Sequence, residues 1–266
     1  MDCRFQEKSF NIYVNAISLQ SGSSGNCIYI ETGNKKLLFD AGISSVEAER
    51  RLSAFGRNMR DVDALIISHD HGDHVRHAGV YQRKYGLPVF ITQKTFGHAV
   101  KRHNLGKIEN IHYFSTGEEI RFDEVVVQSM PSPHDGVDGS VFVVSSSEKQ
   151  IGIFTDIGFV SEDIYQTVSK LDAVFIESNY DPEMLKKGNY PAFLKQRISG
   201  PNGHLSNRQS AELLLAGDNL KWACLAHLSN NNNDPLLALK THREIVSEDL
   251  QLYVASRHKA TGILSV

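Results

Sequence analysis

The sequence has few cysteines and no long hydrophobic run, and each absence excludes a class of protein. Three cysteines occur in 266 residues, widely spaced and odd in number. They form neither a disulfide framework nor a thiolate zinc site, so we expect reduced thiols. The longest apolar runs, such as 64–67, 151–154 and 213–216, fall far short of the roughly 18 to 20 residues that a membrane-spanning helix needs. We therefore do not expect an integral membrane protein.

The sequence also lacks an export signal and an excess of positive charge. Residues 1–8 carry both charge signs and lead into no apolar core, so we expect a cytoplasmic protein. The formal net charge is −3 and the pI is near 6.5, which gives no overall attraction to nucleic acid. A nucleic-acid partner would need a local basic patch. What the sequence does contain is 12 histidines, several of them clustered, which indicates metal binding or acid–base chemistry.

Residues 1–266 contain no repeat, low-complexity tract or Pro/Gly-rich linker, so we expect a single domain. Short β-branched and aromatic runs predict strands, and longer amphipathic segments predict helices. The expected strands are 11–19, 26–31, 36–39, 64–67, 88–91, 109–114, 124–130, 140–145, 151–154, 173–176, 222–226 and 251–254. The expected helices are one opening at Ser44, then 75–85, 93–104, 161–169, 206–216 and 235–246. Strands at both ends of the chain with helices between them favour layered sheets flanked by helices.

A cluster of four metal-binding residue types follows directly after the apolar run 64–67. His69, His71, Asp73 and His74 are spaced His-x-His-x-Asp-His. The first two could give nitrogens to one cation, and the other two an oxygen and a nitrogen to its neighbour. A solvated polar loop is the alternative interpretation. Four such residues in this order after a buried strand favour the metal site.

This segment resembles the signature of the metallo-β-lactamase superfamily, whose fold is an α+β, four-layer αββα sandwich. The other motifs of that family match the chain in order, so the resemblance covers nearly all of it. It implies the following roles: Asp40 orients the metal-binding loop, His134 joins His69 and His71 at the first metal, Asp156 bridges both metals, and His227 joins Asp73 and His74 at the second. Two divalent ions are implied, zinc or manganese, with iron also compatible with these ligands.

Hydrolysis is the reaction class that such a centre implies, because two cations activate water and polarise the bond under attack. Members that act as di-iron oxidoreductases typically carry Glu where His71 stands here. Metallo-β-lactamases proper usually carry Cys where Asp156 stands here. The resemblance therefore disfavours both electron transfer and antibiotic hydrolysis.

Two loops outside the metal motifs are candidates for substrate contact. The segment 21–27 offers small residues and free backbone N–H groups, with Ser23, Ser24 and Asn26 as candidate contacts; a tight glycine turn is the alternative. His204 stands just before an expected helix that Ser206 could cap. The helix N-terminus favours an anion such as phosphate, so Ser206 is a fourth candidate contact. An ordinary loop histidine is the alternative there.

An acidic residue at the end of another expected strand is a candidate partner for one of the histidines. Glu177 ends the run 173–176 and could orient a nearby imidazole, although a structural turn acid explains it equally well. The three features together resemble the nuclease-like phosphodiesterase branch of the superfamily, and most closely its YycJ (WalJ) type. In that branch the histidine matched by His204 contacts the scissile phosphate or protonates the leaving oxygen, and the acid matched by Glu177 supports it. Asp73, His204 and Glu177 are thus the expected catalytic residues.

The expected function is a dinuclear metal-dependent phosphodiesterase acting on DNA or RNA, with 5′-end exonuclease action implied by the resemblance. Fewer than fifty residues separate Asp156 from His204, too few for the inserted domain by which RNase J clamps nucleic acid. The region 186–208 could supply a basic patch with aromatic residues, or a solvated helical face. The alternatives are a small-molecule hydrolase, such as a lactonase or thioester hydrolase, and a regulatory binding protein that holds metal structurally.

Overall fold

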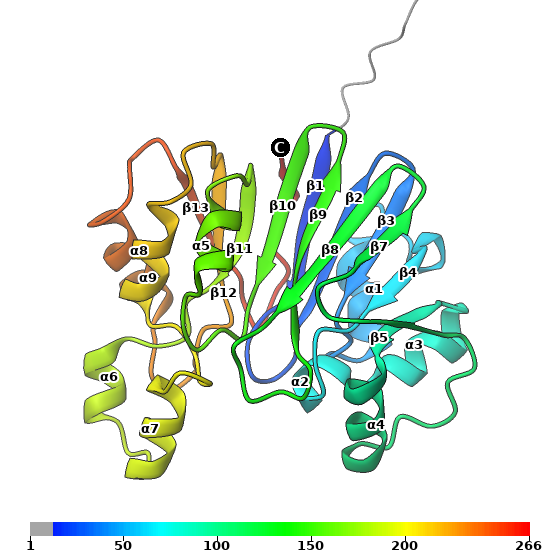
Figure 1. The fold of residues 1–266 in the computed structure, drawn as a ribbon, viewed down its shortest axis with the longest axis horizontal. Coiled ribbons are helices and arrows are strands. Elements are labelled where there is room, and N and C mark those ends of the chain that lie inside the picture. Colours follow the sequence, from blue (N-terminus) through cyan, green and yellow to red (C-terminus); the bar gives the residue numbers. More distant parts are fainter. Residues whose placement is uncertain (1–12) are drawn as a thin grey trace, which may run out of the picture.

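The computed structural model describes residues 13–266, so Cys3, Asn11 and the segment 1–8 lie outside the described residues. Two seven-stranded sheets pack face to face, and helices cover both outer surfaces (Figure 1). The first sheet contains, in spatial order, β14 (Leu264–Ser265), β1 (Val14–Gln20), β2 (Cys27–Thr32), β3 (Lys35–Phe39), β4 (Ala64–Ile66), β5 (Val89–Thr92) and β6 (Ile111–Phe114). The second contains β13 (Gln251–Val254), β12 (Trp222–Ala226), β11 (Ala173–Glu177), β10 (Lys149–Phe154), β9 (Ser140–Ser146), β8 (Val125–Pro131) and β7 (Glu119–Phe122).

Both sheets pass from antiparallel to parallel pairing along the chain. In the first, β1, β2 and β3 pair antiparallel, and β4, β5 and β6 then continue parallel to β3. In the second, β7 to β10 pair antiparallel, and β11, β12 and β13 continue parallel to β10. Parallel neighbours need crossover connections, and these place the helices on the outer faces.

Three apolar layers hold the sandwich together. The layer between the sheets includes Phe39 and Phe142, whose ring centres lie 5.4 Å apart across it. One outer layer packs the first sheet against helices through residues such as Leu52 and Tyr81, and the other packs the second sheet against helices through residues such as Leu213. The helices are α1 (Ser45–Ser53), α2 (Gly72–Val75), α3 (Ala78–Tyr85), α4 (Gln93–Arg102), α5 (Glu162–Val168), α6 (Pro182–Lys187), α7 (Ala192–Ser199), α8 (Asn207–Leu214) and α9 (Pro235–Arg243). The expected four-layer αββα sandwich is confirmed.

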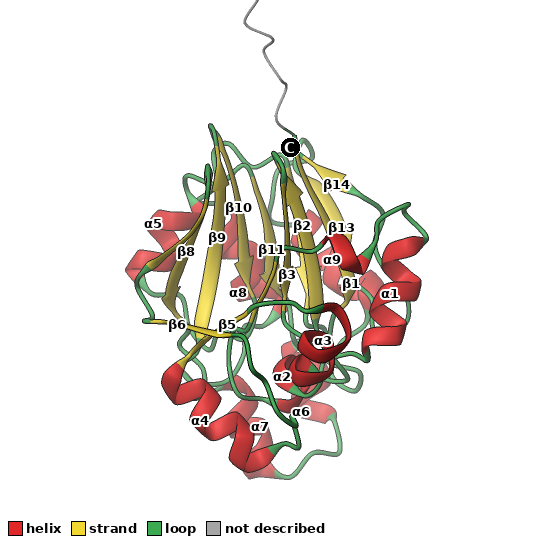
Figure 2. Cartoon of the chain, turned by 90° about the vertical axis from the view of Figure 1, so that its right-hand side faces the viewer, coloured by secondary structure: helices red, strands yellow, loops and turns green. Residues whose placement is uncertain are grey.

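The structure differs from the predicted elements in a few places. The expected helix 75–85 begins later, as α3 at Ala78, and residues 72–75 form the separate helix α2. Between these two helices the Ala41 backbone accepts from the His77 N–H and donates to the His74 carbonyl. Strands β7 and β14 and helices α6 and α7 were not predicted from the sequence. Figure 2 shows α4, α6 and α7 together at one end of the sandwich. No helix in residues 13–266 is both long and apolar enough to cross a membrane.

Candidate metal centre

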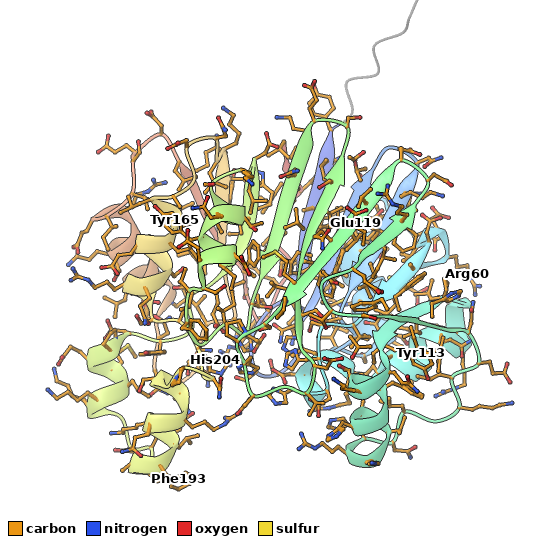
Figure 3. All side chains as sticks on the ribbon, viewed as in Figure 1. Arg60, Tyr113, Glu119, Tyr165, Phe193 and His204 are labelled. Carbon is orange, nitrogen blue, oxygen red and sulfur yellow. The ribbon has the colours of Figure 1, made fainter. Side chains whose placement is uncertain are left out.

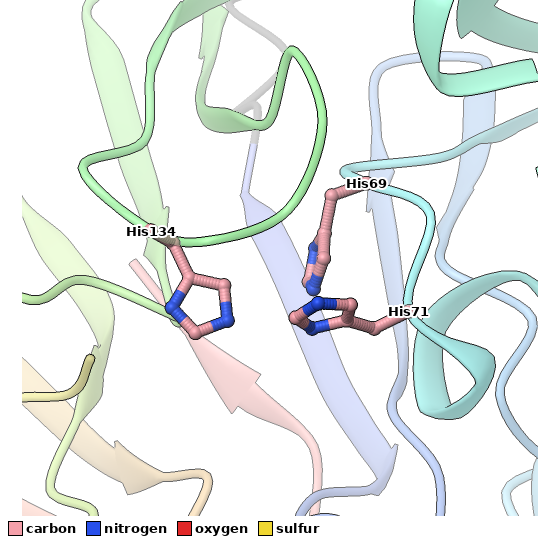
Figure 4. A group of neighbouring side chains, drawn as sticks. All are labelled: His69, His71 and His134. Carbon is pink, nitrogen blue, oxygen red and sulfur yellow. The ribbon is translucent and has the colours of Figure 1, made fainter. Parts of the chain in front are cut away.

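The residues predicted to bind metal meet at one edge of the sandwich, where strands of both sheets end. The segment after β4, a loop that leads into α2, carries four of them, and the loops after β8, β10 and β12 carry the other three. In Figure 4, His69 and His71 extend from the first of these loops toward His134 on the loop after β8. Side chains converge here because the carboxyl ends of neighbouring parallel strands lie at one edge of a sheet. The structure thus brings together all seven residues: His69, His71, Asp73, His74, His134, Asp156 and His227.

Three histidines form the first group. A ring nitrogen from each of His69, His71 and His134 lies within 4.8 Å of the others. His134 donates from Nδ1 to the Gly203 carbonyl at 2.7 Å, so that its Nε2 faces the carboxylates of Asp135 and Asp156 at 3.3 and 3.6 Å. The Nε2 atom of His69 is buried and has no hydrogen-bond partner. Buried polar atoms almost always have a partner, so these nitrogens have the arrangement expected of ligands for a cation.

Asp156 links this group to a second one. Asp73, His74 and His227 offer ligand atoms within 4.8 Å of one another, and Asp156 lies within the same reach of His69 and His74. One carboxylate oxygen of Asp156, Oδ2, is buried and lies 3.2 Å from Nε2 of His74. Burial alone would raise the pKa of Asp156, but the neighbouring His227 and His74 hold it well below its usual range. Asp156 therefore presents an anionic oxygen between the two groups.

Asp40 fixes the orientation of the second group. Its Oδ2 accepts from Nδ1 of His74 at 2.7 Å, so that the other nitrogen of this ring faces the centre. Its Oδ1 accepts from the backbone N–H of Ser68 at 2.8 Å, at the start of the metal-binding loop. Asp40, Asp156 and His227 all have left-handed backbone, with φ of 64°, 59° and 56°. This conformation is uncommon for residues other than glycine and costs energy that the surrounding structure must offset.

Glu177 holds two imidazoles at the rim of the centre. Its Oε1 accepts from Nδ1 of His204 at 2.8 Å and from Nδ1 of His227 at 2.9 Å. Its Oε2 accepts from the backbone N–H groups of Ile157 and Leu205 at 2.8 and 3.1 Å. Burial opposes ionisation of this carboxyl, but the charge of His204 and these hydrogen bonds lower the pKa of Glu177 to about 2. His204, labelled in Figure 3, remains partly open to solvent, and its ring centre lies 4.8 Å from that of His134.

The predicted substrate-binding residues fall into two sets. Ser23 and Ser24 are exposed on the loop after β1. Asn26 is buried, where it accepts from a backbone N–H of its own loop and lies 2.9 Å from a nitrogen of His74. Ser206 is also buried and forms a capping box with Gln209 at the start of α8. Of the four, only Ser23 and Ser24 have side chains open to a ligand.

Sequence reasoning missed Asp70, which occupies a spacer position of the metal motif. This residue is fully buried. It accepts from the backbone N–H of Val137 at 2.8 Å and from the guanidinium of Arg102 at 3.0 Å. It thereby joins the loop after β4 to the loop that carries His134. Its burial requires such partners, but the sequence alone does not identify them.

Asp135 is a second residue that sequence reasoning missed. One of its oxygens lies 3.4 Å from Nε2 of His71, and the other accepts from Arg197 of α7 at 2.6 Å. Arg197 belongs to the region 186–208, where Lys187 and Arg208 are also paired with carboxylates. Much of the expected basic patch is therefore neutralised. Phe193 of α7 is nonetheless exposed at the end of the molecule (Figure 3).

Comparisons with known proteins agree with this geometry. A family model described as the metallo-beta-lactamase superfamily matches residues 21–222. Exodeoxyribonuclease WalJ of Streptococcus pneumoniae is 35% identical over 93% of this chain and 96% of its own length. Exodeoxyribonuclease YycJ of Bacillus anthracis is 34% identical over 86% of this chain and 88% of its own.

Among solved structures, the metallo-beta-lactamase fold protein YhfI of Bacillus subtilis superposes with a TM-score of 0.73. It is 14% identical, and the match covers 96% of this chain and all of that one. At this identity the likeness concerns the fold alone. The family model covers well over half of the chain, and the two curated relatives match it over nearly their full lengths. The chain therefore belongs to the metallo-beta-lactamase superfamily.

Proposed function

We propose that the protein is a dinuclear metal-dependent phosphodiesterase that hydrolyses nucleic acid, with DNA as substrate and exonuclease action from the 5′ end. The observation that carries the proposal is the pair of His204 and Glu177 at the rim of the metal centre. Hydroxide attack on a phosphodiester expels an oxygen that must be protonated, and an imidazole held at the rim of the centre can supply that proton. The names of WalJ and YycJ as exodeoxyribonucleases support the same substrate class.

Seven residues would hold the two ions, which we propose to be zinc or manganese. His69, His71 and His134 would bind the first, and Asp73, His74 and His227 the second, with Asp156 between them. The buried Nε2 of His69, which has no hydrogen-bond partner, and the anionic oxygen of Asp156 between the two groups support this assignment. Mixed imidazole and carboxylate donors suit both metals. When bound, such ions supply a water of lowered pKa and polarise the phosphate oxygens.

The residues at the rim position and protonate the substrate. Glu177 accepts from Nδ1 of His204 and stabilises the protonated ring, so that Nε2 can donate its proton to the leaving 3′-oxygen as the P–O bond breaks. The product would then retain a 5′-phosphate. The hydrogen bond from His134 to the Gly203 carbonyl fixes the preceding residue of the same loop. This contact ties the position of His204 to the first group of ligands.

The test is cleavage of 5′-phosphorylated DNA and RNA, single- and double-stranded, by protein reconstituted with zinc or with manganese. His204→Ala should lower the rate of DNA cleavage about 10²- to 10⁴-fold, the usual contribution of a general acid, while two ions per chain remain by elemental analysis. Asp73→Ala should lose both an ion and cleavage. His112→Ala, which removes an exposed histidine of β6, is the matched control and should behave as the parent protein.

Two results would contradict the proposal. Hydrolysis of lactones or thioesters without nucleic-acid cleavage would identify a small-molecule hydrolase. Retention of two ions with hydrolysis of neither class would identify a metal-holding binding protein.

A further inference from the structure

A long stretch of the chain contains no acidic residue. Between Asp73 and Glu109 there is no Asp or Glu over 35 residues, although the whole chain has 31 of them and a net charge of −3. An average stretch of this length would contain about four. The same stretch contains seven Lys and Arg residues: Arg76, Arg83, Lys84, Lys94, Lys101, Arg102 and Lys107. The chain thus has a local excess of positive charge that its overall balance hides.

Helix α4, within this stretch, lies along the two loops that form the first group of metal-binding residues. Lys94, at its start, approaches Asp138 on the loop after β8 at 3.7 Å. Arg102, at its end, pairs with Asp70 on the loop after β4 at 3.0 Å. Lys94, His98 and Lys101 are exposed and separated by four and three positions, so they share one face of the helix. Figures 1 and 2 show α4 at the same end of the sandwich as α7.

Basic side chains also reach the metal-binding loop itself. The guanidinium of Arg76 and the ring of His103 both lie 3.1 Å from the point where a Cβ on Gly72 would stand. Gly72 is the residue between His71 and Asp73. Within residues 13–266, neither Arg76 nor Lys101 forms an ion pair with a carboxylate. These cations are therefore available to an anion that approaches the centre from this side.

We propose that Arg76, Lys94, His98, Lys101 and Arg102 form a surface, the α4 basic surface, that binds the phosphodiester backbone of a nucleic-acid strand. This inference rests on the proposed function and names how the substrate is held. A row of cations beside a hydrolytic centre suits the regularly spaced phosphates of a nucleic-acid strand. Each phosphate that a Lys or Arg neutralises releases a bound counterion, which favours binding. The strand would thus reach the centre along α4 and meet His204 on the opposite side.

The test compares two double variants that remove the same charge. Lys94→Ala/Lys101→Ala alters the α4 basic surface. Lys170→Ala/Lys221→Ala removes two exposed lysines that precede β11 and β12, at the opposite edge of the second sheet. Binding of a fluorescent, 5′-phosphorylated phosphorothioate DNA strand to the metal-loaded proteins is followed by anisotropy from 50 to 200 mM salt. The first variant should bind at least tenfold more weakly at 100 mM salt, and its slope of log K against log[salt] should be shallower by roughly 1.5.

A further variant tests whether lost charge, and not lost packing of the lysine side chains, weakens DNA binding. His98→Glu places a carboxylate in the middle of the row without removing a lysine, and it should also weaken DNA binding. The variant at the opposite edge should match the parent protein. If Lys94→Ala/Lys101→Ala and His98→Glu both bind DNA with the parent affinity and salt slope, the α4 basic surface does not bind DNA and the proposal is wrong.

Hydrolysis of bis(p-nitrophenyl) phosphate separates this inference from the proposed function, because so small a diester reaches only the metal centre. The ratio of kcat/KM for DNA to that for the small diester should fall about tenfold in the α4 variant. The metal-loaded parent protein could also bind DNA through α4 but cleave neither substrate. That result would support DNA binding by the α4 basic surface and contradict the proposed phosphodiesterase activity.

Discussion

At the scale of single residues, the metal centre depends on a glycine where three segments touch. A Cβ on Gly42 would lie 1.7 Å from the carbonyl oxygen of Asp73 and 2.6 Å from the backbone nitrogen of Asn26. The Gly42 N–H donates to the Asn26 carbonyl at 3.0 Å, and the Asn26 N–H donates to the Asp73 carbonyl at 2.7 Å. These bonds hold the metal-binding loop against the loop after β1. A side chain at position 42 would separate them.

Gly42→Ala should therefore destabilise the protein by roughly 3 kcal/mol, the upper range for overpacking, and lower its metal content. Gly97→Ala is the matched control, since a Cβ there meets nothing within 4 Å. That change lies inside α4 and should stabilise the protein by up to about 1 kcal/mol, because alanine favours helix. Urea unfolding of both variants measures the difference. Equal midpoints for the two would show that the contact at Gly42 is not tight.

The sequence predicted local residue clusters better than distant partners. His69, His71, Asp73 and His74 stand within six positions, so their spacing alone indicated a metal site. Asp70 stands among them, yet its partner Val137 is 67 positions away. A fold is needed before such a contact can be named. Ser206 shows the opposite case, because a local signal for helix capping was present and the structure uses it.

At the scale of helices and strands, a neutral histidine joins α9 to α8. His242 donates from Nδ1 to the Ala238 carbonyl at 2.8 Å and accepts at Nε2 from the Ser210 hydroxyl at 3.1 Å. The side chain is fully buried. Burial lowers the pKa of His242 from 6.5 to about 4, because the charged ring would lose its hydration.

This shift makes the packing of α9 sensitive to acid. Below pH 6.5 the unfolded chain binds a proton at His242 that the folded chain does not, so stability from this residue is full above pH 6.5 and declines as pH falls toward 4. The loss is about 3 kcal/mol over that range. His242→Gln, which cannot titrate, should be less stable than the parent protein at pH 7, and the gap should narrow by pH 4.5 in urea unfolding. A gap that stays constant with pH would show that His242 is not the titrating group.

The predicted helices and strands were most accurate where a pattern was strong. The strands at 222–226 and 251–254 have the predicted bounds. Strand β7 was missed because only Ile120 of its four residues is buried, so the run lacks the apolar content of an inner strand. Helix α6 had a start signal in the sequence, Asp181 as cap followed by Pro182, which was not used to predict a helix.

At the scale of the whole molecule, the proposed ions would connect the two sheets. The loop after β4 belongs to the first sheet, and His134, Asp156 and His227 follow strands of the second. Each group of ligands draws on both. The two sheets otherwise meet through the apolar layer between them. Bound metal would therefore act as a cross-link within the folded state.

Metal removal should accordingly lower thermal stability. An ion at a hundred times its dissociation constant stabilises the folded state by about 2.7 kcal/mol, which for a chain of this size corresponds to a rise in Tm of roughly 5 to 10 °C. We expect this shift when apo protein prepared with a chelator is titrated with zinc or manganese in a calorimeter. His227→Ala should show a smaller shift, and His112→Ala the full one. An unchanged Tm on metal addition would contradict the assignment of the ligands.

The change from antiparallel to parallel pairing in each sheet has a consequence for the architecture. Asp40 follows β3 and Asp156 follows β10, and each strand is the last before its sheet becomes parallel. Both aspartates also adopt left-handed backbone. The two sheets thus share one order of pairing, with an aspartate in left-handed backbone after the last antiparallel strand of each. Neither sheet alone carries all the metal-binding residues, so the centre exists only where the two sheets meet.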